Sequence, residues 1–144
     1  MNELLYSLDG LDSVVELLYN LMNTHQIFTL SGPLGAGKTT LIKRLLARCG
    51  VQEVVVSPTF TYVAIYSNDT GDTFYHFDLY RLSSLSSFIE SGFDEYLYAP
   101  QSWAFIEWPE ICEPLLTKGI CHISIDYASE HERVLSWTSS KSRV

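Results

Sequence analysis

The chain has 144 residues, 47% of them hydrophobic and 18% charged, which is typical of a single soluble globular domain with its own core. A formal net charge of −8 and only nine Lys and Arg disfavour a protein that grips RNA or DNA by itself and suit docking on basic protein partners. Three separated cysteines without a C-x-x-C pair favour buried thiols over a zinc site or disulfides, and we expect a cytoplasmic monomer with no signal peptide and no membrane span.

The first predicted helix covers residues 11–24, where apolar side chains recur at steps of three and four. A short apolar strand at 26–30 follows, and residues 40–49 form a second predicted helix that ends before Gly50. The strand and the second helix enclose a glycine-rich segment, which is the most informative stretch of the chain.

That segment, Gly32 to Thr39, reads GPLGAGKT and fits the phosphate-binding pattern G-x-x-x-x-G-K-[ST]. Glycines let backbone N–H groups approach a polyanion, and the N-terminus of the following helix faces the same charge. Lys38 would reach the β- and γ-phosphates, and the Thr39 hydroxyl would be a magnesium ligand. A chance match in a glycine-rich turn is the alternative, which the strand–loop–helix context disfavours.

Residues 54–56 are predicted to form a short strand that runs into Ser57-Pro58-Thr59. Two hydroxyl groups around a proline indicate a shaped loop, although on the pattern alone a capped turn is the favoured interpretation. Strands at 62–66 and 74–78 flank a turn at 68–72 and predict a hairpin.

The second hairpin strand carries His76 and Asp78 on one face, because side chains alternate along a strand. That face is either functional or a solvated surface, and the pattern leaves both open. Helical pieces are expected at 88–98 after an entry loop at 83–87, and the apolar strand 103–107 ends in Glu107. In a parallel sheet such an acid would lie opposite the phosphate loop and could serve magnesium; the alternative is an acid that faces solvent.

The remaining predicted elements are a helix at 111–116, strands at 122–126 and 134–137, and a frayed tail at 139–144. Together the elements predict one α/β domain over residues 1–138 with the P-loop NTPase fold: a mixed, mostly parallel sheet between helices in a three-layer sandwich. The candidate chemistry is phosphoryl transfer, with Lys38 on the phosphates, Thr39 and Glu107 on the metal, and Asp78 as a second carboxylate. ATP is favoured over GTP, because no D-x-x-G occurs and Thr117-Lys118-Gly119-Ile120 lacks the Asp of a guanine motif.

Four motifs, GPLGAGKTT, SPTFTY, HFDLYRL and IEWPE, occur in this order between residues 32 and 110. In this the chain resembles the TsaE (YjeE) family, small P-loop ATPases of bacterial tRNA threonylcarbamoyladenosine synthesis. The resemblance implies an accessory, slow ATPase that resets a TsaD–TsaB complex and meets tRNA only through that complex. One departure is Pro33, where the family commonly has an acidic residue.

The resemblance also implies roles for individual residues. ATP phosphates would be lined by Gly35, Ala36, Gly37, Lys38, Thr39 and Thr40; magnesium would be held by Thr39 and Glu107; Ser57, Pro58 and Thr59 would form a nucleotide-sensing loop; and Asp78 would be an acid needed for hydrolysis.

Two other functions remain open at this point. A small-molecule kinase usually has a lid with several arginines, whereas the five arginines here are scattered. A nucleotide-gated adaptor would bind ATP and scarcely hydrolyse it.

Overall fold

Seven strands form one sheet, in the order β1-β7-β6-β2-β5-β4-β3, within residues 2–140, the part of the chain that the computed structural model describes. The strands are β1 (Asn2–Ser7), β2 (Ile27–Ser31), β3 (Val63–Ser67), β4 (Thr73–Asp78), β5 (Ser102–Glu107), β6 (Ile120–Tyr127) and β7 (Glu132–Ser140). The four central strands β6, β2, β5 and β4 are mutually parallel, and the outer pairs β1–β7, β7–β6 and β3–β4 are antiparallel.

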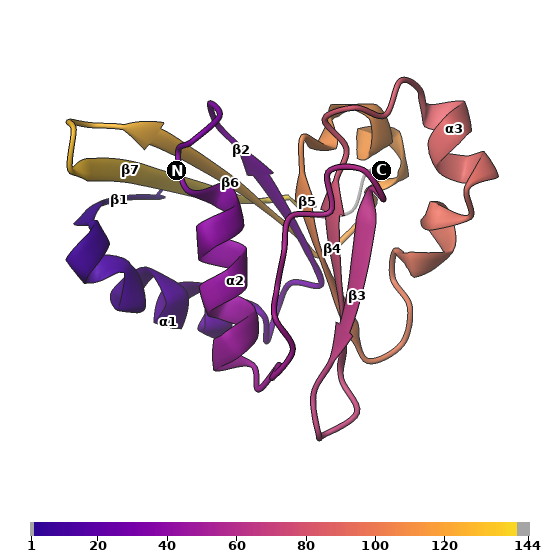
Figure 1. The fold of residues 1–144 in the computed structure, drawn as a ribbon, viewed down its shortest axis with the longest axis horizontal. Helices are drawn as coiled ribbons and strands as arrows, with labels where there is room; N and C mark the ends of the chain where they lie inside the picture. The colour runs from indigo at the N-terminus through magenta and orange to yellow at the C-terminus, as the bar shows by residue number, and fades with distance from the viewer. Residues whose placement is uncertain (1, 141–144) are drawn as a thin grey trace.

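Helices cover both faces of this sheet (Figure 1). On one face lie α1 (Leu11–Leu21) and α2 (Lys38–Arg48); on the other lie α3 (Leu85–Glu90) and the 3₁₀ helices η2 (Phe93–Tyr96) and η3 (Pro109–Leu115). Each face has its own buried cluster, the first built on the apolar stripes of α1 and α2 and the second on aromatic rings around Phe77 and Phe88. The predicted mixed, mostly parallel sheet and its three layers are therefore confirmed.

The sheet differs from the prediction at two places. Residues 2–7 form the edge strand β1, which was not predicted because only Tyr6 of its six side chains is buried and no alternation shows in the sequence. The strand expected at 54–56 is absent: Val55 is buried, but Val54 and Val56 are 79% and 58% exposed, and the β3–β4 hairpin occupies this edge of the sheet. Residues 54–56 have local β-propensity but no neighbouring strand to pair with.

Several element boundaries also move. Helix α1 ends at Leu21 rather than at residue 24, and α2 begins at Lys38 rather than at residue 40, so Lys38 already belongs to the first helical turn. Helix α3 begins at Leu85, earlier than expected, because the Ser84 hydroxyl caps it by accepting a hydrogen bond from the Ser87 N–H. The helix expected at 111–116 is the 3₁₀ helix η3, which contains Pro114.

The expected frayed tail begins too early, since β7 extends through Ser139 and Ser140 and these residues pair with Cys121 and Ile120. The rest of that tail, residues 141–144, lies outside the described residues. Cys112 and Cys121 are buried and Cys49 is partly buried; burial raises the thiol pKa of Cys112 to about 12 and that of Cys49 to about 11. Within residues 2–140, none of the helices has the length and apolarity needed to cross a bilayer.

The parallel centre of the sheet brings three strand ends together. Strand β2 lies next to β5, which lies next to β4, so the segments that follow these strands meet at one edge. The register pairs Asp78 with Glu107 and Leu30 with Glu107, which puts both acids level with the start of the glycine-rich loop. Ligands of open α/β sheets bind beyond this carboxyl edge.

Candidate functional site

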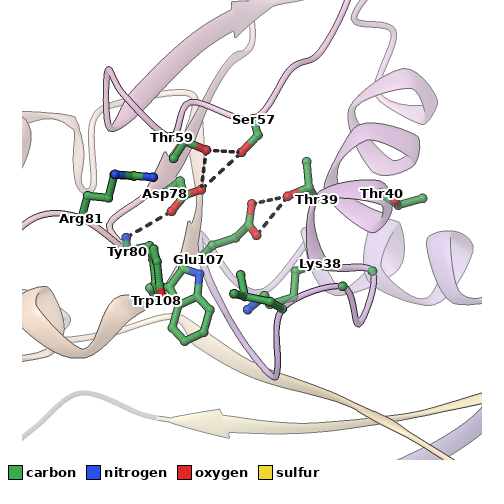
Figure 2. Close-up of a pocket in the computed structure, with 13 residues that line it drawn as sticks. Lys38, Thr39, Thr40, Ser57, Thr59, Asp78, Tyr80, Arg81, Glu107 and Trp108 are labelled. Atoms are coloured by element: carbon green, nitrogen blue, oxygen red, sulfur yellow. Dashed lines mark hydrogen bonds between the residues drawn. The ribbon is translucent and has the colours of Figure 1, made fainter.

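A cleft of about 430 Å³ lies at this edge, between the first turn of α2 and the ends of β4 and β5 (Figure 2). Its wall combines apolar and polar side chains, and most of the predicted site residues belong to it. The lining residues are Leu34, Gly35, Gly37, Lys38, Thr39, Thr40, Ser57, Thr59, Asp78, Tyr80, Arg81, Glu107 and Trp108.

The backbone of the glycine-rich loop is fixed by close contacts. Gly32 has φ +146°, and a Cβ at this residue would lie 2.2 Å from the Ile125 carbonyl oxygen, so only glycine fits. The Ala36 N–H donates to the Pro33 carbonyl oxygen at 3.2 Å, and Gly37, at φ +108°, precedes the first residue of α2. Pro33 therefore takes part in the loop as an acceptor, and its missing N–H leaves the turn intact.

Lys38 is buried to 4% exposure and makes two contacts. Its Nζ donates to the Gly32 carbonyl oxygen at 2.6 Å and lies 3.7 Å from the centre of the Trp108 ring. Loss of water lowers the pKa of Lys38, and the negative charges of Glu107, Asp78 and Glu110 act against that change. The ammonium group thus faces the cleft with a carbonyl and an aromatic face as its partners, both weaker than a phosphate.

Trp108 holds its position through an unusual backbone conformation. It has φ +57°, in the left-handed region, directly after the end of β5 and before Pro109. Its ring also lies 4.9 Å from the Tyr80 ring, which follows β4. Non-glycine residues in this region cost free energy and concentrate at functional sites.

Glu107 is 3% exposed and accepts hydrogen bonds from two other elements. The Thr39 Oγ1 is 3.1 Å from Oε1 and 3.0 Å from Oε2, which joins the start of α2 to the end of β5 (Figure 2). The His76 Nε2 lies 2.6 Å from Oε2, and His76 is fully buried.

Asp78 joins the loop that contains Ser57 to the sheet. Its Oδ2 accepts from Ser57 Oγ at 3.2 Å and from Thr59 Oγ1 at 3.4 Å, and its Oδ1 accepts from the Tyr80 N–H at 3.1 Å (Figure 2). The two hydroxyls are also 3.0 Å from each other. A group that displaced either hydroxyl would therefore remove a hydrogen bond from the Asp78 carboxylate.

The donor set of the cleft resembles a magnesium site that is completed by phosphates. Among the described residues, no group of three or more His, Cys, Asp and Glu is arranged to hold a metal ion. Mg²⁺ keeps several waters and is commonly bound by one or two carboxylates together with substrate phosphates, so one hydroxyl and one carboxylate at the phosphate loop fit that mode. The residues present suit a magnesium ion that arrives with phosphates.

Most predicted site residues meet in this cleft, but two do not line it. Ala36 is 2% exposed, packs into the core of the α1–α2 face, and uses its N–H within the loop. Pro58, in the same loop as Ser57 and Thr59, is buried and does not reach the cleft. The interpretation of His76 and Asp78 as a solvated strand face is wrong, since both are buried, at 0% and 7% exposure.

The sequence assigned no role to four residues that line the cleft: Leu34, Tyr80, Arg81 and Trp108. His76, for which a functional face and a solvated face were both left open, is hydrogen-bonded to Glu107. Tyr80 and Arg81 lie within HFDLYRL and Trp108 within IEWPE, so the motifs that carried the family resemblance already contained them. Leu34 is an unspecified position of the phosphate pattern and nothing in the sequence marks it.

The strand–loop–helix unit, the parallel strand ends and the cleft between them define an α/β protein of the P-loop class. The family model described as "Threonylcarbamoyl adenosine biosynthesis protein TsaE" matches residues 5–135. The chain therefore belongs to the TsaE family, which confirms the resemblance seen in its motifs.

Individual relatives agree. Three proteins named tRNA threonylcarbamoyladenosine biosynthesis protein TsaE match: that of Rickettsia felis is 34% identical over 90% of this chain and 74% of its own length, that of Bacillus subtilis 37% identical over 81% and 72%, and that of Treponema pallidum 35% identical over 81% and 84%. Among solved structures, the crystal structure of Bacillus subtilis YdiB superposes with a TM-score of 0.68 and 27% identity, over 96% of this chain and 86% of that one.

Proposed function

We propose that the cleft binds ATP with Mg²⁺ and that the protein hydrolyses ATP. The observation that carries the proposal is the meeting, in one cleft, of a phosphate loop, a buried lysine and two buried carboxylates from neighbouring parallel strands. This is the set of parts that phosphoryl transfer to water requires: a phosphate cradle, a charge on the terminal phosphates, metal ligands and a group that orients the nucleophile.

Each part that phosphoryl transfer requires would be supplied by residues of the cleft. The N–H groups of Gly35 and Gly37 and of the first turn of α2 would contact phosphate oxygens, and Lys38 would exchange its carbonyl partner for the β- and γ-phosphates. Thr39 and Glu107 would hold the magnesium ion, which when bound neutralises the charge that develops on the phosphates. Asp78 would orient the attacking water.

We further propose that this activity serves threonylcarbamoyl transfer to adenosine in tRNAs that read codons beginning with A. The relatives' names supply the pathway, and the partners would be the TsaD and TsaB proteins, with tRNA contacted only through them. The acidic character of the chain, with net charge −8, supports a subunit that acts on proteins rather than on nucleic acid.

One observation favours slow turnover by the isolated protein. Both oxygens of Asp78 already accept hydrogen bonds, from the hydroxyls of Ser57 and Thr59 and from the Tyr80 N–H. These three donors use most of the acceptor sites of the carboxylate, so movement of this loop would free Asp78 for the attacking water, and a partner that moves the loop would raise the rate. A nucleotide-gated adaptor that scarcely hydrolyses ATP is the limiting case and the second candidate function.

The test is to measure ATP turnover by the purified protein alone and with TsaD and TsaB, in Mg²⁺ and after its removal with a chelator. We expect slow, magnesium-dependent release of phosphate that rises when the partners are added and is absent from Lys38→Ala. Nucleotide binding without turnover under any of these conditions would favour the adaptor. Transfer of phosphate to a small-molecule acceptor faster than to water would favour a kinase.

A further inference from the structure

His76 is a buried polar side chain close to the cleft, and the proposed chemistry does not use it. It is on β4, fully buried, and its Nε2 lies 2.6 Å from Glu107 Oε2. It does not line the cleft. Asp78, two residues further along β4 and on the same face, lines the cleft. His76 is therefore further from the cleft than Asp78 on this face of the sheet.

The ring has only one of its two nitrogens paired. Among the described residues, His76 Nδ1 is the only buried side-chain nitrogen or oxygen without a hydrogen-bond partner. Because a carboxylate accepts, the short contact with Glu107 requires a ring proton on Nε2, and Nδ1 is left without a partner. An unpaired buried polar atom destabilises the folded state, so a residue that only filled this part of the core would be apolar.

The two oxygens of Glu107 are not equivalent. Oε2 accepts from both His76 and Thr39, whereas Oε1 accepts from Thr39 alone, at 3.1 Å. If the Thr39 hydroxyl turns toward a cation, Oε1 loses its only partner while Oε2 keeps the histidine. The bond from β4 therefore fixes the plane of the carboxylate and leaves Oε1 as the oxygen that is free to face the cleft.

We propose that His76 is a positioning residue for Glu107: its Nε2–H holds Oε2 so that Oε1 is presented to a divalent cation or to the water around it. The cation part of this inference rests on the proposed function, whereas the orientation of Glu107 does not. Polar groups that orient a metal-binding carboxylate typically contribute 10–100-fold to metal affinity.

The test compares His76→Leu, which removes the donor at similar size, with His76→Gln, whose amide Nε2 can donate from nearly the same position. His122→Leu is the matched control, since His122 also lies on a central strand but bonds to Thr29 Oγ1 rather than to an acid. Mn²⁺ affinity in the presence of ATP is read by electron paramagnetic resonance. We expect a loss of about 10–100-fold in His76→Leu, wild-type affinity in His122→Leu, and substantial recovery in His76→Gln.

A second readout needs neither metal nor nucleotide. Crystal structures of the ligand-free variants should show Glu107 displaced or disordered in His76→Leu and in place in His76→Gln, with circular dichroism confirming that both fold. In a Glu107→Ala background, His76→Leu should cause no further loss of Mn²⁺ affinity, because the histidine acts through the acid.

The outcomes separate the two proposals. Failure of wild type to bind Mn²⁺ and ATP would overturn the proposed function and leave the structural test of His76 standing. Glu107 in its original place in the His76→Leu crystal, with unchanged Mn²⁺ affinity, would overturn the positioning role, and so would equal losses in His76→Leu and His76→Gln.

Discussion

Two loops border the cleft, and they are held in different ways. The phosphate loop, residues 32–37, is fixed by its own backbone: Gly32 lies against the Ile125 carbonyl, the Ala36 N–H bonds to Pro33, and the Ala36 side chain is in the core. The Ser57 loop, residues 51–62, has no helix or strand and leaves Val54, Val56 and Phe60 exposed.

The Ser57 loop is held partly by its backbone, through the bond from the Tyr62 N–H to the Pro58 carbonyl oxygen, and partly by side-chain hydrogen bonds. Ser57 and Thr59 bond to Asp78, and the Tyr66 hydroxyl accepts from the Val56 N–H at 3.2 Å. Hydrogen bonds between neutral hydroxyls and a carboxylate can be exchanged for contacts to a ligand, whereas a backbone fixed by steric contact cannot change without unfolding. The comparison suggests a rigid cradle on one side of the cleft and an adjustable segment on the other.

The largest effect is expected from Gly32→Ala. The new methyl group would meet the Ile125 carbonyl oxygen at 2.2 Å, and alanine disfavours φ +146°, so the free energy of unfolding should fall by about 3 kcal/mol or more. Urea denaturation measures it. Gly10→Ala is the control, because its Cβ would meet no atom closer than 3.8 Å. Equal stability of the two variants would show that the phosphate loop is not rigid.

Glu107→Ala should come next. Loss of one preorganised charged group typically costs about 2–4 kcal/mol of transition-state stabilisation, which corresponds to roughly 30–1,000-fold in the rate of magnesium-dependent ATP hydrolysis. The exposed neighbour Glu110→Ala serves as the control for removing a carboxylate near the cleft. Wild-type turnover in Glu107→Ala would transfer the metal role to Asp78.

Lys38→Ala should weaken nucleotide binding by about 1.5–3 kcal/mol, the usual contribution of a hydrogen bond to a charged group. Isothermal titration calorimetry with ATP and Mg²⁺ measures the change. Lys43→Ala, which removes the same charge from a later turn of α2, should bind as the wild type does. An unchanged affinity in Lys38→Ala would mean that the loop does not cradle phosphate.

The smallest effects belong to the adjustable loop. Ser57→Ala and Thr59→Ala each remove one bond to Asp78 and should raise amide hydrogen exchange over residues 51–62. Because these bonds are long, at 3.2 and 3.4 Å, each is worth only about 1 kcal/mol. Thr61→Ala is the control, since its hydroxyl donates to the Val63 carbonyl oxygen and not to the acid. Added ATP should also change amide exchange over residues 51–62; unchanged exchange there on addition of ATP would show that this loop is not adjustable.

The sequence predicted the phosphate loop and its flanking elements better than the segment that leads into the Ser57 loop. The phosphate loop has a fixed spacing of glycines and lysine, so it could be located from the sequence, and the flanking apolar runs gave β2 and α2. Strand β5 with Glu107 at its end was recoverable for the same reason, because a buried parallel strand is continuously apolar.

Long-range pairing was not recoverable. Val54 and Val56 have strand propensity but find no neighbour, whereas residues 2–7 have little pattern and pair with β7 over their whole length. The bond between His76 and Glu107 joins residues 31 positions apart, and only the β4–β5 register brings them together. Propensity is local, and both outcomes were decided by tertiary contacts.

The register of β4 against β5 has a consequence for changes in chain length. Asp78 is paired with Glu107 along a parallel ladder that starts at Thr73 and Ser102, and a slip of one residue would turn both His76 and Asp78 to the opposite face. Insertions and deletions should therefore be tolerated at the 68–72 turn, where the hairpin reverses, and be excluded between Thr73 and Asp78. Homologous chains should vary in length at the 68–72 turn, and the number of residues between that turn and Asp78 should stay constant.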